Sequence, residues 1–176
     1  MFNCKDLFRI RNLCILAMLI AMEVVLERLL AINTLIVKIN LAFVPVALSA
    51  YLFGPVGGML CYGIGDVVGS LLFPAGAFNP LFTLTCVIVG LMYGVILQGT
   101  TKWWKIAIAS FLARTIGTLV LNALWISVFF SPKGYTAIML ARIPEAAIMF
   151  AAEIIILIPL FCGGGNWLRH LRKNSR

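Results

Sequence analysis

The sequence predicts an all-α integral membrane protein, a six-helix bundle with both termini in the cytoplasm. Of its 176 residues, 62% are hydrophobic and 11% are charged, whereas a soluble domain carries roughly 25% charged residues. The mean hydropathy is +1.07. Because one spanning helix takes about 20 apolar residues, six helices would use about 120 of them. The remaining residues suffice for short loops but not for a soluble catalytic or nucleotide-binding domain.

This composition excludes a soluble globular enzyme, a disordered chain and a nucleic-acid-binding domain, despite a net charge of +8 and a pI of 9.6. We expect one membrane domain over residues 1–176. The positive charge then belongs to basic flanks of the spans or to a site for an anionic ligand. The five cysteines lie in or beside apolar runs. They show no metal-ligand spacing, so they predict packing roles and no metal site.

Glycine, proline and charges delimit the expected spans. The first apolar run is longer than the core of a signal peptide, so it predicts a retained span. No charge occurs between Ile39 and Gly65, and the glycine- and proline-rich residues 54–58 predict a turn between two spans. Residues 73–80 contain too much proline and glycine for a helix. The expected spans are 12–31, 39–53, 57–73, 80–98, 105–130 and 144–162.

Lysine and arginine set the expected orientation. Six spans place both termini on one side of the membrane, and nine of the fourteen basic residues lie on that side. Short cytoplasmic loops are enriched in these residues, so both termini are expected in the cytoplasm. Three tryptophans, Trp103, Trp104 and Trp167, fall at the same boundary, as interfacial anchors do. The nine basic residues are Lys5, Arg9, Arg11, Lys102, Lys105, Arg169, Arg172, Lys173 and Arg176.

Four other basic residues, Arg28, Lys38, Lys133 and Arg142, lie toward the outside in this topology. Lys38 and Lys133 can also be read as solvated loop charges. Arg28 ends a helix that carries acids, and Arg142 precedes the last expected span. An outward pocket rimmed by these cations would suit a carboxylate-bearing ligand, because arginine grips carboxylates through two parallel hydrogen bonds.

Three charged residues fall near the expected bilayer midplane: Asp66, Arg114 and Glu153. Each costs at least about 2.5–3.5 kcal/mol at a helix centre, so each needs a partner or a function. One hypothesis is a structural ion pair, in which Arg114 pairs with Asp66 or with Glu153. The other is that one carboxylate points into a ligand pocket and accepts hydrogen bonds from an amino-heterocycle. The residues alone leave both open.

Two helical patterns add candidate contact surfaces. Trp125 lies one turn after Asn122, which offers an indole face and an amide to a flat ring. Ala17 and Ala21 form a small-xxx-small pattern that lets another helix approach closely. The partner helix is either internal or part of another subunit. The chain has no phosphate-binding loop and no metalloprotease or serine-hydrolase motif, so we expect no enzyme and no ATPase activity.

Several stretches, taken in order, carry a resemblance. The first are AMLIAMEVVLERLL and VKINLAFVPVALSAYLFGPVGG, followed by Asp-x-x-Gly-x-x-x-Phe-Pro at 66–74 and Phe-x-Leu-Thr at 82–85. VGLMYG and Asn-x-Leu-Trp at 122–125 complete the series. Over about residues 10–160 the chain resembles the substrate-binding S component of energy-coupling factor (ECF) vitamin transporters, and within that group the folate-specific members.

The resemblance implies a protein that binds folate on the outer side of the bacterial plasma membrane and carries out no reaction. It implies partnership with an energising module of one membrane subunit and two ATPase subunits, without a cofactor or nucleic acid. Ala17 and Ala21 would dock the membrane subunit. Trp125, Phe73 and Phe78 would stack on the ligand rings, and Asp66 or Asn122 would receive pterin donors. Arg28, Lys38 or Arg142 would neutralise the glutamate tail, and Pro74 and Asn79 would complete the site.

Three alternatives remain at this stage. An S component for another vitamin, such as riboflavin or biotin, shares the architecture. A small membrane enzyme could use Glu23, Asp66 and Glu153 as acid–base groups. A structural or assembly subunit would bind no small molecule.

Overall fold

The computed structural model describes residues 9–33, 38–74, 79–100, 102–129 and 135–164. Within these ranges the chain is helical apart from connecting residues and one small antiparallel ladder. That ladder pairs β1 (Ile32–Asn33) with β2 (Lys38–Ile39). The predicted all-α class is therefore confirmed.

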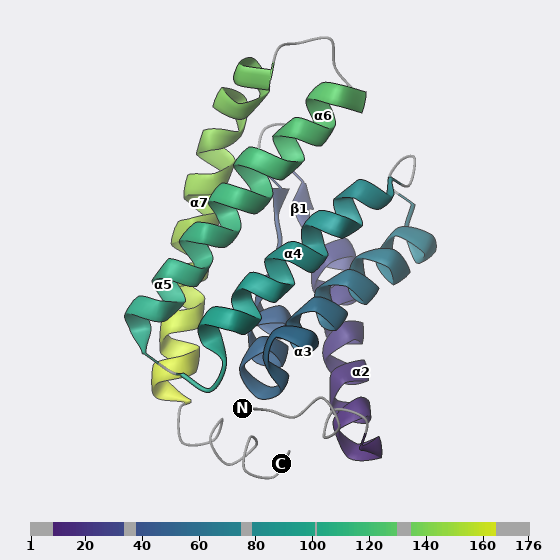
Figure 1. Ribbon diagram of the computed structural model, residues 1–176, viewed down its shortest axis with the longest axis vertical. Coiled ribbons are helices and arrows are strands. Elements are labelled where there is room, and N and C mark those ends of the chain that lie inside the picture. The colour runs from purple at the N-terminus through teal and green to yellow at the C-terminus, as the bar shows by residue number, and fades with distance from the viewer. Residues whose placement is uncertain (1–8, 34–37, 75–78, 101, 130–134, 165–176) are drawn as a thin grey trace.

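The helices pack as one bundle (Figure 1). Helix α5 continues through the π-helical segment η2 into α6, and this rod runs beside α7. Helices α3 and α4 pack closely against each other, and α2 packs on α3. The start of α2 and the end of α7 lie at the same end of the bundle in Figure 1. The bounds are α2 (Ile10–Val24), η1 (Val25–Leu29), α3 (Phe43–Leu72), α4 (Pro80–Leu97), α5 (Trp103–Leu112), η2 (Ala113–Asn122), α6 (Ala123–Phe129) and α7 (Tyr135–Gly163).

Helix α3 contains both the second and the third expected spans. Its backbone leaves helical geometry at Gly54, with φ 72° and ψ −154°. A positive φ is accessible to glycine at little cost, and the following Pro55 cannot donate to the helical ladder. The break thus occurs within the glycine- and proline-rich segment that predicts it.

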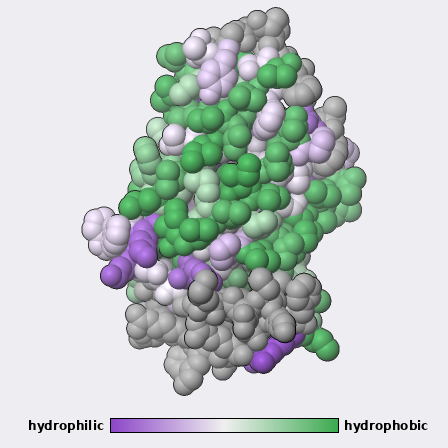
Figure 2. All heavy atoms as spheres, in the orientation of Figure 1, coloured by the Kyte–Doolittle hydropathy of each residue, from purple (hydrophilic) through white to green (hydrophobic). Residues whose placement is uncertain are grey.

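Four helical segments in the described ranges are long and apolar enough to cross a membrane. They are Phe43–Leu72, Pro80–Leu97, Trp103–Val128 and Ile138–Gly163. Figure 2 shows hydrophobic side chains over much of the face it presents. The protein is therefore a multi-pass membrane protein by length and composition, while the six-span count and the cytoplasmic termini stay predictions.

Helix α7 begins at Tyr135, earlier than the expected start near residue 144. Pro144 lies inside the helix and does not open it. Proline is tolerated within helices of membrane proteins because neighbouring groups satisfy the freed backbone carbonyl. As a result, Arg142 and Glu145 both lie on helical backbone.

Glycine allows a close backbone contact between α3 and α4. A Cβ added to Gly58 would lie 2.3 Å from the Gly90 carbonyl oxygen, and one added to Gly90 would lie 2.3 Å from the Gly58 oxygen. Small residues permit such backbone approach between membrane helices. The contact fixes α4 against the second half of α3, and both helices contribute to the site below.

Candidate functional site

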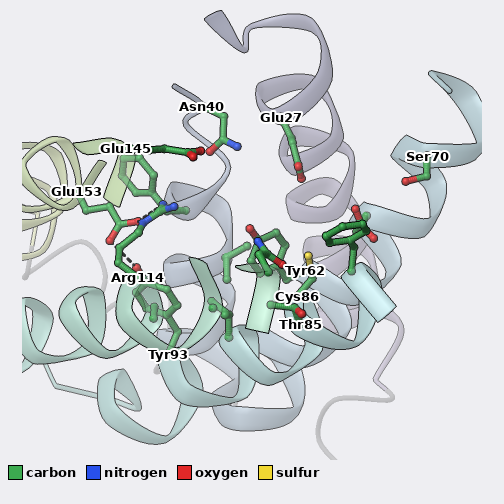
Figure 3. Close-up of a pocket in the computed structure, with 18 of the residues that line it drawn as sticks. Glu27, Asn40, Tyr62, Ser70, Thr85, Cys86, Tyr93, Arg114, Glu145 and Glu153 are labelled. Carbon is green, nitrogen blue, oxygen red and sulfur yellow. Dashed lines mark hydrogen bonds and ion pairs between the residues drawn. The ribbon is translucent and has the colours of Figure 1, made fainter. Parts of the chain in front are cut away.

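A cavity of about 430 Å³ lies between η1, α3, α4, η2 and α7. Its volume falls within the roughly 300–1,000 Å³ typical of small-molecule sites. Figure 3 shows side chains from these elements pointing into it. The polar and charged lining residues are Glu27, Arg28, Asn40, Tyr62, Asp66, Ser70, Asn79, Thr85, Cys86, Tyr93, Arg114, Asn122, Arg142, Glu145 and Glu153.

The first charged group of the cavity joins the end of the first helix to α3 and α4. Arg28 Nη2 lies 3.2 Å from Asp66 Oδ1 and donates to Ser70 Oγ at 2.8 Å. Thr83 Oγ1 donates to Asp66 Oδ2 at 2.6 Å. Arg28 passes beside Gly69, where an added Cβ would lie 3.0 Å from Nε. Asp66 therefore pairs with Arg28 rather than with Arg114.

The second charged group crosses from η2 to α7 and α4. Arg114 Nε donates to Glu153 Oε1 at 2.7 Å, and Nη2 donates to the same oxygen. Tyr93 OH donates to the other oxygen, Oε2, at 2.9 Å. Glu153 is fully buried. Of the two pairings left open by the sequence, the structure contains Arg114–Glu153, and Figure 3 shows it at the cavity wall.

A third pair, Arg142 and Glu145, lies within α7, with Nη1 and Oε2 3.6 Å apart. Its side chains are 28% and 18% exposed. At about 1.5 Å per residue, Arg142 lies about 16 Å from Glu153 along the helix. Along α7 the cavity thus extends from the fully buried carboxylate of Glu153 to the partly exposed pair of Arg142 and Glu145.

The two π-helical segments both contribute to the cavity. Segment η1 supplies Glu27 and Arg28, and η2 supplies Arg114, Gly117 and Asn122. Single π turns inside α-helices occur frequently at functional sites, because the extra residue per turn redirects side chains. Neither segment contains proline, so no local signal in the sequence predicts them.

Five predicted site residues line the cavity: Arg28, Asp66, Asn79, Asn122 and Arg142. Asn79 also caps α4, since its Oδ1 accepts the Leu81 N–H at 3.1 Å. These five residues lie far apart in the sequence. The structure brings them together from η1, α3, the start of α4, η2 and α7.

The other predicted residues lie elsewhere. Trp125 is not among the lining residues. Its Nε1 donates to Thr85 Oγ1 at 3.1 Å, and Thr85 in turn donates to the Leu81 carbonyl at 3.2 Å. Trp125 thus contacts the cavity indirectly, by holding the side chain of the lining residue Thr85 in place. Phe73 and Pro74 are exposed after the end of α3, and they do not line the cavity.

Two predicted residues cannot be placed as side chains. Lys38 lies in β2, but its side chain is outside the described part, and Phe78 lies outside the described residues.

Ala17 and Ala21 are both exposed on α2, away from the cavity lining. In the described residues these two alanines thus remain accessible to a second helix, and their docking role stays a prediction.

Sequence reasoning missed several lining residues, notably Glu27, Tyr62, Thr85, Cys86 and Tyr93. Tyrosine, threonine and cysteine occur on many membrane helices without binding anything, so their types carry little signal. Glu27 carried the clearest signal in the sequence, because it is an acidic residue within an apolar run.

The cavity lining contains buried atoms with unsatisfied hydrogen-bonding capacity. Asn122 Oδ1 and Arg28 Nε are buried and have no hydrogen-bond partner among the described residues. A buried polar atom without a partner costs about 1–3 kcal/mol. Asn122 Oδ1 and Arg28 Nε therefore present an acceptor and a donor that a bound molecule could satisfy.

Comparisons with known proteins agree with the resemblance seen in the sequence. A sequence model of the family described as ECF transporter, substrate-specific component, matches residues 11–161. A folate transporter FolT of Clostridium novyi (strain NT) is 31% identical over 143 residues, covering 81% of this chain and 83% of the relative. A folate transporter FolT of Leuconostoc mesenteroides subsp. mesenteroides is 31% identical over 150 residues, covering 82% and 80%.

A solved structure agrees as well. The crystal structure of FolT bound with folic acid has a TM-score of 0.77 and 29% sequence identity to this chain. The match covers 86% of this chain and 91% of that one. The sequence match over most of the chain and the shared fold lead to one conclusion: this protein belongs to the substrate-specific components of ECF transporters.

Proposed function

We propose that this protein is the folate-binding S component of an ECF transporter. It captures folate on the outer side of the bacterial plasma membrane and delivers it through a separate ATPase-driven module. The observation that carries the proposal is the shared fold, at 29% identity, with a FolT structure that contains folic acid. The cavity of about 430 Å³ supplies a site of suitable size.

The cavity chemistry matches the parts of folate. The flat pterin ring carries N–H donors, and Asn122 Oδ1 is a buried acceptor without a partner among the described residues. Tyr62 and Phe82 supply aromatic surface in the lining. Arg142, at the partly exposed end, is the proposed partner of the glutamate tail, with Lys38 as a second cation. Binding and release require no covalent step, so the protein acts as a carrier.

Calorimetry of the detergent-purified protein tests the substrate. We expect saturable binding of folic acid and no comparable heat with riboflavin, biotin or thiamin. Binding of one of those vitamins without folic acid binding would overturn the assignment and favour a different S component. Saturable binding to none of them would favour an assembly subunit.

Asn122→Leu is expected to weaken folic acid binding by about 5- to 100-fold, because the ligand donor loses a buried acceptor. Calorimetry measures the change. The control is Ser127→Ala on the same rod. Ser127 Oγ donates to the Leu124 carbonyl, and Ser127 does not line the cavity. Equal losses of affinity in the two variants would mean that Asn122 acts only through helix packing.

The energising module is proposed from family membership, and α2 offers a surface for it. Ala17 and Ala21 are exposed there beside the large apolar side chains of Met18 and Met22. Small residues flanked by apolar ones allow a second helix to approach closely. We therefore propose that this face of α2 docks the membrane subunit.

Ala17→Trp is expected to abolish co-purification with the module while leaving folic acid affinity unchanged, because the bulky indole would block the approach of the partner helix. Pull-down and calorimetry measure the two properties. Ile155→Trp is the control, since Ile155 is also an exposed apolar residue, at 71%, but lies on α7. Loss of the module from the Ile155 variant alone would move the docking face to α7.

A further inference from the structure

Three arginines of the described chain line the cavity and each faces an acid, but the three pairs differ in how they are held. Arg28–Asp66 is supported by Ser70 and Thr83. Arg114–Glu153 is supported by Tyr93. Among the described residues, Arg142 and Glu145 have no further hydrogen-bond or ion-pair partner.

The Arg142–Glu145 pair is also the loosest of the three. Its 3.6 Å separation is too long for a hydrogen bond. Partly exposed pairs of this kind contribute at most about 1 kcal/mol, because water screens them. Glu153, in contrast, accepts three hydrogen bonds in a buried site. An incoming carboxylate can therefore compete for Arg142 far more easily than for Arg114.

Helix geometry keeps Glu145 in place beside that cation. Residues three apart on a helix face the same side, and both Arg142 and Glu145 line the cavity. Figure 3 shows the Glu145 side chain directed toward Asn40, which lines the cavity from the segment before α3. A ligand carboxylate that reaches Arg142 thus also approaches the Glu145 carboxylate.

We propose that Glu145 is an internal competitor for Arg142 and thereby determines specificity for ligand charge. This inference rests on the proposed folate function. Without ligand, Glu145 compensates the Arg142 charge. With ligand, Arg142 turns to the tail carboxylate, and Glu145 remains as a like charge beside it. Glu145 therefore lowers affinity in proportion to the negative charge at that end of the ligand and leaves recognition of the rings unchanged.

The test compares two ligands that differ in tail charge and in the two methyl groups that remove it. Folic acid carries two tail carboxylates, and folic acid dimethyl ester carries none but keeps the pterin and the linker. Binding to the full-length protein in detergent is measured by calorimetry for the wild type, Glu145→Gln and Glu145→Ala. We expect both variants to bind folic acid about two- to tenfold more tightly than the wild type. Affinity for the ester should change by less than about twofold, since no charge repulsion is relieved.

Two controls test whether the change in affinity is caused by charge at this end of the ligand. Arg142→Gln should weaken folic acid and leave the ester nearly unchanged, which places the tail at this arginine. Raising the salt concentration should shrink the gain of Glu145→Gln, because screening weakens partly exposed charges.

The outcomes separate the two proposals. If the wild type does not bind folic acid, the proposed function fails and this inference falls with it. If the wild type binds and Glu145→Gln binds folic acid equally or more weakly, the inference alone is overturned, because Glu145 then supports the site. Equal tightening for folic acid and ester would also overturn it, since the effect would be one of packing.

Discussion

Glu153→Leu is expected to lower the free energy of unfolding by about 3–5 kcal/mol, because it leaves the mostly buried Arg114 side chain without its counter-charge. Glu153 is fully buried, and it accepts hydrogen bonds from both Arg114 and Tyr93. Its loss leaves donors from two other elements unsatisfied at once. Thermal unfolding in detergent, followed by tryptophan fluorescence, measures the change.

Two further variants serve as controls for the effect of Glu153→Leu on stability. Glu145→Gln removes an acid of the loose, partly exposed pair, and should cost no more than about 1 kcal/mol. The double variant Arg114→Leu/Glu153→Leu removes both charges, and should be less destabilised than Glu153→Leu alone. A double variant as unstable as the sum of its single changes would contradict a direct ion pair.

Gly58→Ala is expected to destabilise the bundle by about 1–3 kcal/mol or more, because its Cβ has no space. That atom would lie 2.3 Å from the Gly90 carbonyl oxygen, and a backbone oxygen cannot move aside as a flexible side chain can. Helices α3 and α4 would have to separate, and the cavity wall would shift with them. Thermal unfolding gives the stability, and calorimetry with folic acid should show a parallel loss of affinity.

Gly163→Ala is the matched control for this change. A Cβ at Gly163 would meet no atom within 4 Å, so we expect a change within about 0.5 kcal/mol. If both alanine variants unfold at the wild-type temperature, the α3–α4 contact is not as close as the structure indicates.

Local chemistry explains which parts of the fold the sequence predicts. The helix break at Gly54 and Pro55 depends on two adjacent residues whose backbone preferences differ from all others. The charges at Asp66, Arg114 and Glu153 were identifiable because each is costly in an apolar span. Arg28 and Arg142 were predicted as outward-facing cations, and Asn122 from its place one turn before Trp125. Asn79 came only from the resemblance.

Other features depend on distant parts of the chain. The π-helical segments η1 and η2 place Arg28, Arg114 and Asn122 at the cavity. No residue within these segments predicts that the helix there has an extra residue per turn. The hydrogen bond from the Trp125 N–H to Thr85 Oγ1 was not predicted either, because it depends on where α4 lies relative to α6. The stacking of the Trp125 ring on a ligand stays a prediction.

The sequence by itself determined the helical class, the helix break, the candidate membrane segments and the family, because these depend on residue type and short-range order. Only the tertiary structure decided which acid each arginine meets. Arg114 could pair with Asp66 or Glu153 by depth alone, and it pairs with Glu153 because the rod of α5, η2 and α6 packs along α7. Asp66 is then held by Arg28. Charge pairing in a membrane bundle follows from which helices are neighbours, and that is a property of packing over the whole chain.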